Sequence, residues 1–318
     1  MTQTYGFEIE CFGLTPAELQ TAINSVDGAE VAVPTGYATY TYGENAPTMS
    51  RIFGYTESKE VGLRCTRTQG VSVWMAARDG SISNTSGRGI AHEIISPILY
   101  GQEGIDNMKK VVKALSRAGA KVNSTCGVHV HLGTAHNSRV RRMSAAKKNR
   151  MIHRMADLYR HFKGGIDLLV PASRRTGANH YCANVDYNQS ADNVHENYIN
   201  RGIGFGRGVV NTLNYSSNGT IEFRQHSGSL NGKKLENWAR LMSKIVGWAI
   251  NDNHPSYSRR FTDVCPHNDE RYGYGGVAES MNQLTSLCDF LNVERAHRRA
   301  LLQRANELNG GDIFAEVA

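Results

Sequence analysis

The sequence lacks the features that define several large classes of protein. No apolar run approaches the about 20 residues of a membrane helix, and the first residues have neither a basic leader nor an apolar signal core. Six cysteines are present without a CxxC pair, which argues against a zinc knuckle or a disulfide framework. We therefore expect a cytoplasmic protein with reduced thiols and no membrane partner.

The common nucleotide-binding signatures are also missing. No GxxxxGK[ST] motif occurs, so a P-loop is excluded. A glycine-rich run at 202–208 does not have the context of a dinucleotide fingerprint. We interpret it as a flexible loop, with a flap over a substrate as the alternative.

The composition is that of a basic globular protein. Apolar residues make up 40% of the 318 residues and charged residues 20%, with a net charge of +7. Such a charge suits an anionic partner, and nucleotide, acidic peptide and nucleic acid all qualify. The basic cluster within 139–150 is the best argument for nucleic acid, but few aromatic residues lie among its charges, so nucleic acid is not favoured.

The periodicity of apolar residues predicts a mixture of strands and helices. Strands are expected at 5–12, 71–77, 91–99 and 126–132 and around the turn within 211–224, with hairpins or a long loop at 31–59 and a polar loop at 173–200. Helices are expected at 15–26, 105–118, 144–162, 234–250, 277–292 and 293–308. Because strands and helices intermix without a regular βαβ order, we predict an α+β fold with a mainly antiparallel sheet.

Three of the predicted strands carry pairs of ionisable residues two positions apart. These pairs are Glu8 with Glu10, His129 with His131, and Glu222 with Arg224. Successive side chains of a strand point to opposite faces, so the two members of each pair share one face and the apolar residues between them share the other. Each pair taken alone is also compatible with a solvated surface.

Together the three strands would present three carboxylates, two imidazoles and a guanidinium. Converging carboxylates repel one another, and a divalent cation is the usual compensation. Oxygen ligands with one imidazole suit Mg²⁺ or Mn²⁺ better than zinc. A metal with an arginine is also what phosphoryl transfer requires, because charge develops on the moving phosphoryl oxygens.

Four motifs resemble those of the amidoligase family, which is related to the catalytic domains of glutamine synthetase and glutamate–cysteine ligase. The motifs are Glu8-Ile9-Glu10, Ala91-His92-Glu93-Ile94-Ile95-Ser96-Pro97, Cys126-Gly127-Val128-His129-Val130-His131 and Gly219-Thr220-Ile221-Glu222-Phe223-Arg224-Gln225. They follow the order found in glutamine synthetase, and the resemblance covers about residues 7–231, with the run TIEFRQHSGSLN its most specific part.

The resemblance implies a curved, mainly antiparallel sheet of the glutamine synthetase type with helices on its outer face. It implies ATP and divalent metal, Mg²⁺ or Mn²⁺, as cofactors. The metal ligands implied are Glu8, Glu10, His129 and Glu222, with Glu93 as an addition. His131 would face the nucleotide phosphates, and Arg224 the transferred phosphoryl group or a substrate carboxylate. Arg207 and Asn211 resemble the family's R-x-x-x-N segment and would help to bind nucleotide, although the aromatic residue often found after the arginine is missing.

The function implied is ATP-dependent joining of a carboxylate to an amine. The product would be an amide or isopeptide bond, formed through an acyl phosphate with release of ADP and phosphate, and the substrates could include a peptide or protein. Residues 1–231 would form the catalytic core, and 232–318 a helical part packed on the same domain. Two alternatives remain open: a non-catalytic nucleic-acid- or protein-binding module, and a metal-dependent hydrolase.

Overall fold

The computed structural model describes residues 3–27, 29–32, 72–134, 137–178, 182, 208–212, 215, 219–251 and 277–310. The chain divides into two compact units. The first, here called the sheet unit, comprises Met1–Thr134 and His226–Glu236. The second, here called the helical unit, comprises Ala135–Gln225 and Asn237–Ala318.

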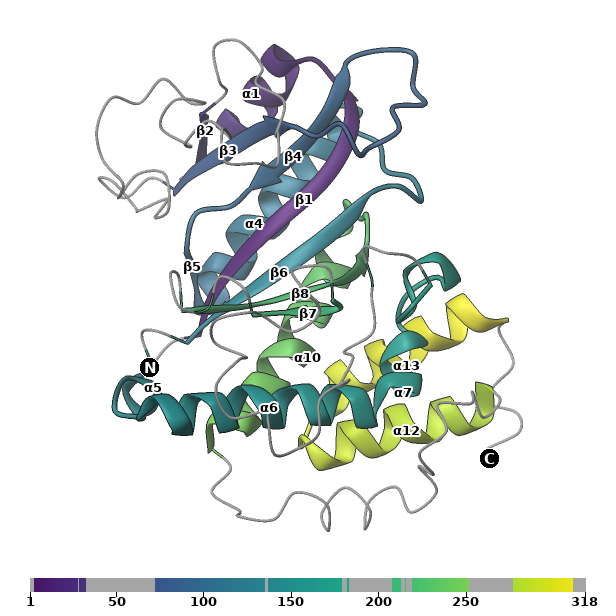
Figure 1. Ribbon diagram of the computed structural model, residues 1–318. Coiled ribbons are helices and arrows are strands. Elements are labelled where there is room, and N and C mark those ends of the chain that lie inside the picture. Colours follow the sequence, from purple (N-terminus) through teal and green to yellow (C-terminus); the bar gives the residue numbers. More distant parts are fainter. Residues whose placement is uncertain are drawn as a thin grey trace. The chain divides into compact units, whose positions relative to one another are not determined.

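The sheet unit is built on an open, mainly antiparallel sheet (Figure 1). Its strands are β1 (Thr4–Leu14), β2 (Ala29–Ala32), β3 (Ser72–Arg78), β4 (Ile90–Ile95), β5 (Leu99–Tyr100) and β6 (Gly127–Gly133). They run in the order β2-β3-β4-β1-β6, and β5 pairs with β1. Only the β2–β3 pair is parallel among the pairings described in this unit. The predicted α+β class is confirmed.

One face of this sheet is apolar and packs against helices. Helix α4 (Gly101–Arg117) lies along β1, and α1 (Pro16–Asn24) contacts α4, β1 and β2 (Figure 1). From β1 this face receives Phe7, Ile9 and Cys11, each at most 1% exposed. The side chains between them, which include Glu8 and Glu10, therefore belong to the opposite face.

Local signals in the sequence explain where several elements of this unit begin or end. Thr15 and Glu18 form the predicted capping box at the start of α1. Gly119, with φ 97°, follows the end of α4 in a conformation that favours glycine. The expected single strand at 91–99 was wrong: β4 ends before Pro97, which has no N–H to donate to a ladder, and β5 pairs separately with β1.

The helical unit contains a short β-ladder and a set of helices. The ladder joins β7 (Val210–Asn211) to β8 (Thr220–Ser227). The helical elements are α5 (Ser138–Arg141), α6 (Ala145–His161), α7 (Lys163–Asp167), the 3₁₀ turn η1 (Ala172–Arg174), α10 (Gly232–Asn251), α12 (Val277–Phe290) and α13 (Arg295–Asn309). The last residues of β8 and the first residues of α10 belong to the sheet unit.

Close packing in the helical unit is clearest where α7 meets α12. A Cβ atom added at Gly165 would lie 2.4 Å from the backbone nitrogen of Leu284, so no larger residue fits there without a shift. Phe290 on α12 contacts Phe162 and Trp248, with ring centroids 6.2 Å and 5.4 Å apart. The predicted long helices are confirmed here, whereas the short helices α5 and α7 were not predicted.

Several predictions fall outside the described residues. Residues 33–59 of the expected loop or hairpins at 31–59 lie there, whereas 31–32 belong to β2. Most of the expected loop at 173–200 lies there too, as does the glycine-rich run up to residue 207. No helix within the described ranges is both long and apolar enough to cross a bilayer. The division of the chain at residue 231 stays a prediction.

Candidate functional site

The polar face of the sheet unit brings together residues from three neighbouring strands. Glu8 and Glu10 lie on β1, Glu93 on β4, and His129 and His131 on β6. In the strand register Glu8 is directly opposite His129, and Glu10 is directly opposite Glu93. The pairing of the strands thus places an imidazole beside one carboxylate and a second carboxylate beside the other.

Glu8 is the centre of a charged hydrogen-bond network. Its Oε2 lies 2.7 Å from Nδ1 of His129, and its Oε1 lies 3.0 Å from Nε2 of His131. Burial opposes ionisation of Glu8, but the charge and hydrogen bonds of His131 and His129 outweigh it and hold its pKa well below the ordinary value. Glu8 is therefore a carboxylate at neutral pH.

The charge of Glu8 decides which ring nitrogens carry protons. An ionised carboxylate can only accept hydrogen bonds, so His129 donates from Nδ1 and His131 from Nε2. When His129 is neutral, its lone pair is on Nε2, and Nε2 lies 3.8 Å from Oε1 of Glu10. Orientation of a histidine by a carboxylate on its other nitrogen is the usual arrangement around protein-bound metals.

Gly6 leaves room for this network on β1. It is directly opposite His131 in the register. A Cβ atom at Gly6 would lie 3.3 Å from the Cβ of His131, which is tighter than an ordinary contact. A glycine in the middle of a strand weakens it, and often marks such a close approach.

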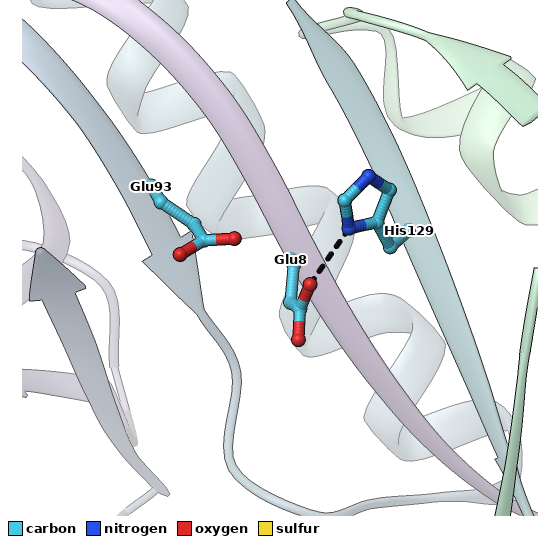
Figure 2. A group of neighbouring side chains, drawn as sticks. All are labelled: Glu8, Glu93 and His129. Atoms are coloured by element: carbon cyan, nitrogen blue, oxygen red, sulfur yellow. Dashed lines mark hydrogen bonds and ion pairs between the residues drawn. The ribbon is translucent and has the colours of Figure 1, made fainter. Parts of the chain in front are cut away.

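Within the described residues of the sheet unit, two overlapping groups of side chains could each hold a metal ion. Glu8, Glu93 and His129 form the first group, drawn in Figure 2, where the Glu93 carboxylate points toward Glu8. Glu10, Asp79 and Glu93 form the second group, and within each group the potential ligand atoms lie within 4.8 Å of one another. This donor set of carboxylates with one imidazole fits Mg²⁺ or Mn²⁺.

Sequence reasoning missed Asp79. The residue follows the last position of β3, and Ala77, two positions earlier, is directly opposite Glu93. The alternation of the strand therefore continues to Asp79 on the face that carries Glu93. The signal was present in the run Ala76-Ala77-Arg78-Asp79, but only the pairing of β3 with β4 shows that this strand end lies beside the site.

His92, next to Glu93, belongs to the core instead. It is fully buried, and its Nε2 lies 2.8 Å from the carbonyl oxygen of Leu14. Burial lowers its pKa, and the hydrogen bond to Leu14 only partly offsets this. It acts as a neutral donor that connects β4 to the end of β1.

The helical unit holds the other predicted residues. Glu222 and Arg224 lie on one face of β8, and the guanidinium of Arg224 pairs with Oε1 of Glu222. Asn211 is opposite Glu222 in the register, and its Nδ2 donates to Oε2 of Glu222 at 2.7 Å. Arg207 lies outside the described residues. Glu222 is 4% exposed, so its charge is balanced within the unit by Arg224.

The structure thus places the predicted residues in two sets. Glu8, Glu10, Glu93, His129 and His131 come together in the sheet unit. Asn211, Glu222 and Arg224 come together in the helical unit. That Glu222 completes the metal ligands, that His131 faces phosphates and that Arg224 and Asn211 bind nucleotide or substrate stay predictions.

Two solved structures are similar to the chain over 99% of its length, at low identity. One is a bifunctional glutathione synthetase from Pasteurella multocida, with 14% identity, a TM-score of 0.41 and 49% of that chain covered. The other is glutamine synthetase from Plasmodium falciparum, with 12% identity, a TM-score of 0.39 and 73% of that chain covered. This chain therefore spans about half the length of the Pasteurella protein. No curated protein sequence matches it significantly.

A sequence model of one protein family matches residues 1–246, which is more than half of the chain. The family is described as "putative amidoligase enzyme". The matched range contains both sets of residues and all the motifs on which the resemblance was based. The chain belongs to this amidoligase family.

Proposed function

We propose that this protein is an ATP-dependent carboxylate–amine ligase that forms an amide or isopeptide bond and releases ADP and phosphate. The observation that supports this most strongly is the cluster of carboxylates and one imidazole on the polar face of β1, β4 and β6. Such a cluster is costly without a cation. In a family of carboxylate–amine ligases, a divalent cation with bound nucleotide is the natural occupant.

The residues proposed to hold Mg²⁺ or Mn²⁺ are Glu8, Glu10, Asp79, Glu93, His129 and Glu222. When bound, the metal would neutralise phosphate charge and orient the γ-phosphoryl group of ATP. Glu8 supports the site in a second way, because its carboxylate orients both imidazoles. With Nε2 of His131 donating to Glu8, a protonated His131 would donate from its other ring nitrogen, Nδ1, to a phosphate oxygen.

The reaction proposed has two steps. An oxygen of the substrate carboxylate attacks the γ-phosphorus of ATP, the bond to the bridging oxygen breaks, and ADP leaves. An amine then attacks the acyl carbon, phosphate leaves with the electrons of the C–O bond, and the amine nitrogen loses a proton. Arg224 is proposed to donate hydrogen bonds to the oxygens on which negative charge develops, and Asn211 and Arg207 to bind the nucleotide.

The finer parts of this proposal concern the substrates and the cellular location. The carboxylate and the amine are small molecules or side chains of a peptide or protein, and the enzyme acts in the cytoplasm. The excess of basic residues, with a net charge of +7, supports an acidic carboxylate substrate.

The first experiment measures the melting temperature with Mg²⁺ alone, Mg²⁺·ADP and Mg²⁺·ATP. A ligand that binds only the native state raises the melting temperature by mass action. We expect Mg²⁺·ATP to stabilise the wild type and to have no effect on Glu93→Gln, and the same loss in Glu222→Ala would place Glu222 at the site. Glu103→Gln is the matched control, because Glu103 is an exposed carboxylate on α4.

Product analysis then separates the ligase from its alternatives. Chromatography of reactions with candidate carboxylates and amines should detect ADP and phosphate, whereas AMP and pyrophosphate would contradict an acyl phosphate. Hydrolysis without any nucleotide would favour a metal-dependent hydrolase. Salt-dependent binding of DNA or RNA, with no effect of nucleotide on stability, would favour the binding module.

A further inference from the structure

Arg174 is a buried arginine that the site described above does not use. It is the last residue of the 3₁₀ turn Ala172–Arg174, and its side chain is directed at β8. Its Nη2 donates to the carbonyl oxygen of Arg224 at 2.7 Å, and the residue is 5% exposed. This places a second guanidinium at the backbone of Arg224.

The charge of Arg174 is not balanced within the described part of the chain. No carboxylate there forms an ion pair with it, its hydrogen bond to Arg224 reaches a neutral carbonyl, and its Nε is buried without an acceptor. An arginine remains protonated in proteins, so the charge cannot be removed by loss of a proton. An uncompensated buried charge is strongly unfavourable.

The buried carboxyl group closest in sequence, Asp167, is engaged elsewhere. Its Oδ1 accepts hydrogen bonds from the backbone N and the Oγ1 of Thr176, at 3.0 Å and 2.8 Å, and from Nε2 of Gln225. Burial raises the pKa of Asp167, although these hydrogen bonds partly oppose the shift. Asp167 therefore stabilises the segment around Arg174 without neutralising it.

The segment that carries Arg174 is held in place before any ligand binds. The backbone N–H of Arg174 donates to the carbonyl of Pro171 at 2.8 Å, and Thr176 is tied to Asp167. Gln225, next to Arg224 on β8, also contacts Thr176 at 3.2 Å. A guanidinium fixed in this way loses little freedom on binding, which favours affinity.

We propose that Arg174, positioned at Arg224 on β8, binds an oxyanion of a substrate. The planar fork of a guanidinium matches the two oxygens of a carboxylate or of a phosphate. The ligand is therefore the carboxylate to be joined or a phosphate group of the nucleotide. This inference rests on the proposed ligase and assigns one of its ligand-binding residues.

Binding of simple oxyanions tests the assignment without knowledge of the substrate. Inorganic phosphate and glutarate are titrated separately, by calorimetry and by melting temperature, in a chloride buffer without metal or nucleotide. We expect at least one of them to bind and stabilise the wild type, and binding to weaken about tenfold or more in Arg174→Met. A response to phosphate alone indicates the phosphoryl group as the ligand, and a response to glutarate alone indicates the substrate carboxylate.

Arg175→Met is the matched control. It removes the neighbouring guanidinium and the same formal charge, but Arg175 donates to Asn309 on α13 instead of β8. Oxyanion affinity should remain at the wild-type value in this variant. An equal loss in both variants would mean that general positive charge, and not the position of Arg174, attracts the anion, and would overturn the proposal.

The stability of Arg174→Met separates a binding role from a purely structural one. Without oxyanions, we expect the variant to unfold at the same temperature as the wild type or higher, because an unbalanced buried charge is gone. A large loss of stability with unchanged oxyanion affinity would show that Arg174 serves only to hold the Arg224 carbonyl, and would overturn the proposal. If the methionine variant does not fold, Arg174→Lys is used instead, because lysine retains the charge without the planar guanidinium. Wild-type oxyanion affinity in that variant would likewise overturn the proposal.

The outcome is independent of the test of the ligase. If Mg²⁺·ATP does not raise the melting temperature of the wild type, but oxyanion binding still depends on Arg174, the ligase proposal fails and the anion-binding site remains. A normal Mg²⁺·ATP effect, with no binding of phosphate or glutarate, would retain the ligase and remove this assignment.

Discussion

Glu8 in the sheet unit is partly buried and Asp167 in the helical unit is buried, and their surroundings favour opposite charge states. Burial opposes the ionisation of each carboxyl group. Glu8 has two imidazoles as partners, which outweigh burial and lower its pKa well below the ordinary value. Asp167 is hydrogen-bonded to neutral groups of Thr176 and Gln225, which do not outweigh burial, and its pKa is raised.

The difference shows that the partners of a buried carboxyl group, more than its burial, decide its role. Glu8 remains charged on a face that carries other carboxylates, as a cation site requires. Asp167 belongs to a buried network that joins α7 to β8, and Tyr159 on α6 extends it by donating to Oε1 of Gln225. The first arrangement is suited to binding and the second to holding a strand in position.

The largest effect should come from a third buried carboxylate, Glu222, which is balanced by an arginine. Replacing it with alanine leaves the guanidinium of Arg224, whose side chain is 14% exposed, without its carboxylate, so we expect Glu222→Ala to lower the free energy of unfolding by about 3 kcal/mol. Urea denaturation measures this. Glu307→Ala is the control, because Glu307 lies 3.9 Å from Arg304 at a more exposed position and should contribute about 0.5 kcal/mol or less. Equal effects of the two variants would contradict the ion-pair role of Glu222.

A smaller loss is expected when Glu8 becomes neutral. Glu8→Gln retains the shape but weakens the charge-assisted hydrogen bonds from His129 and His131, with an expected cost of about 1.5 kcal/mol at pH 7. The pKa of Glu8 is lowered on folding, so the stabilisation is present above the unfolded pKa and is lost as pH falls through the folded pKa. The difference between variant and wild type should therefore shrink in acid, as followed by urea denaturation from pH 7 down to acid pH. A constant difference would mean that Glu8 does not act through its charge.

The opposite sign is expected for Asp167. Its pKa is raised on folding, so the wild type is most favoured below the unfolded pKa and loses stability as pH rises through the folded pKa. Asp167→Asn removes this dependence and can still accept from Thr176, so we expect it to stabilise the protein by about 1 kcal/mol at pH 7 and to have less effect in acid. Melting temperatures of the wild type and of Asp167→Asn, measured from pH 7 down to acid pH, test the sign of this pH dependence. An asparagine variant that is less stable at every pH would show that the carboxylate is needed.

The smallest effect should appear between Glu10 and Glu93, which face each other across β1 and β4. Like charges directly opposite in a sheet are unfavourable, so Glu10→Gln should gain about 0.5 kcal/mol without metal. The same variant should lose stabilisation by Mg²⁺. The amide can still accept the hydrogen bond that Oε2 of Glu10 receives from the Gly127 N–H at 2.7 Å. A loss of stability without metal would contradict repulsion between these two groups.

The faces of single strands could be predicted from the sequence with good success. Alternation within Glu8-Ile9-Glu10 and Val128-His129-Val130-His131 placed the charged groups together on one face, as the structure confirms. The prediction for 91–99 failed because a proline interrupts the strand while the apolar pattern continues through it. Helix ends were predicted within a few residues where a cap was present, as at Thr15 and Ser144.

The set of residues that form the site was harder to predict from the sequence than the strands that carry them. No other acidic residue lies near Asp79 in the sequence, so no local pattern marks it as a metal ligand. Only the pairing of Ala77 with Glu93 brings Asp79 to the metal-binding group. The role of Gly6 likewise depends on its position opposite His131. Arg174 and Arg224, which are joined by a hydrogen bond, are 50 positions apart, and no local pattern relates them to one another.

The sequence by itself determined which strands carry charged residues, on which face of each strand they lie, and the family to which the chain belongs. These properties follow from a two-residue period and from local motifs, which need no knowledge of distant residues. Only the tertiary structure decided which carboxylates face each other, which imidazoles hold Glu8 as an anion, and that Asp167 is held among neutral partners. The reason is physical: pairing register and burial are set by residues far apart in the chain, and the pKa of each group depends on them.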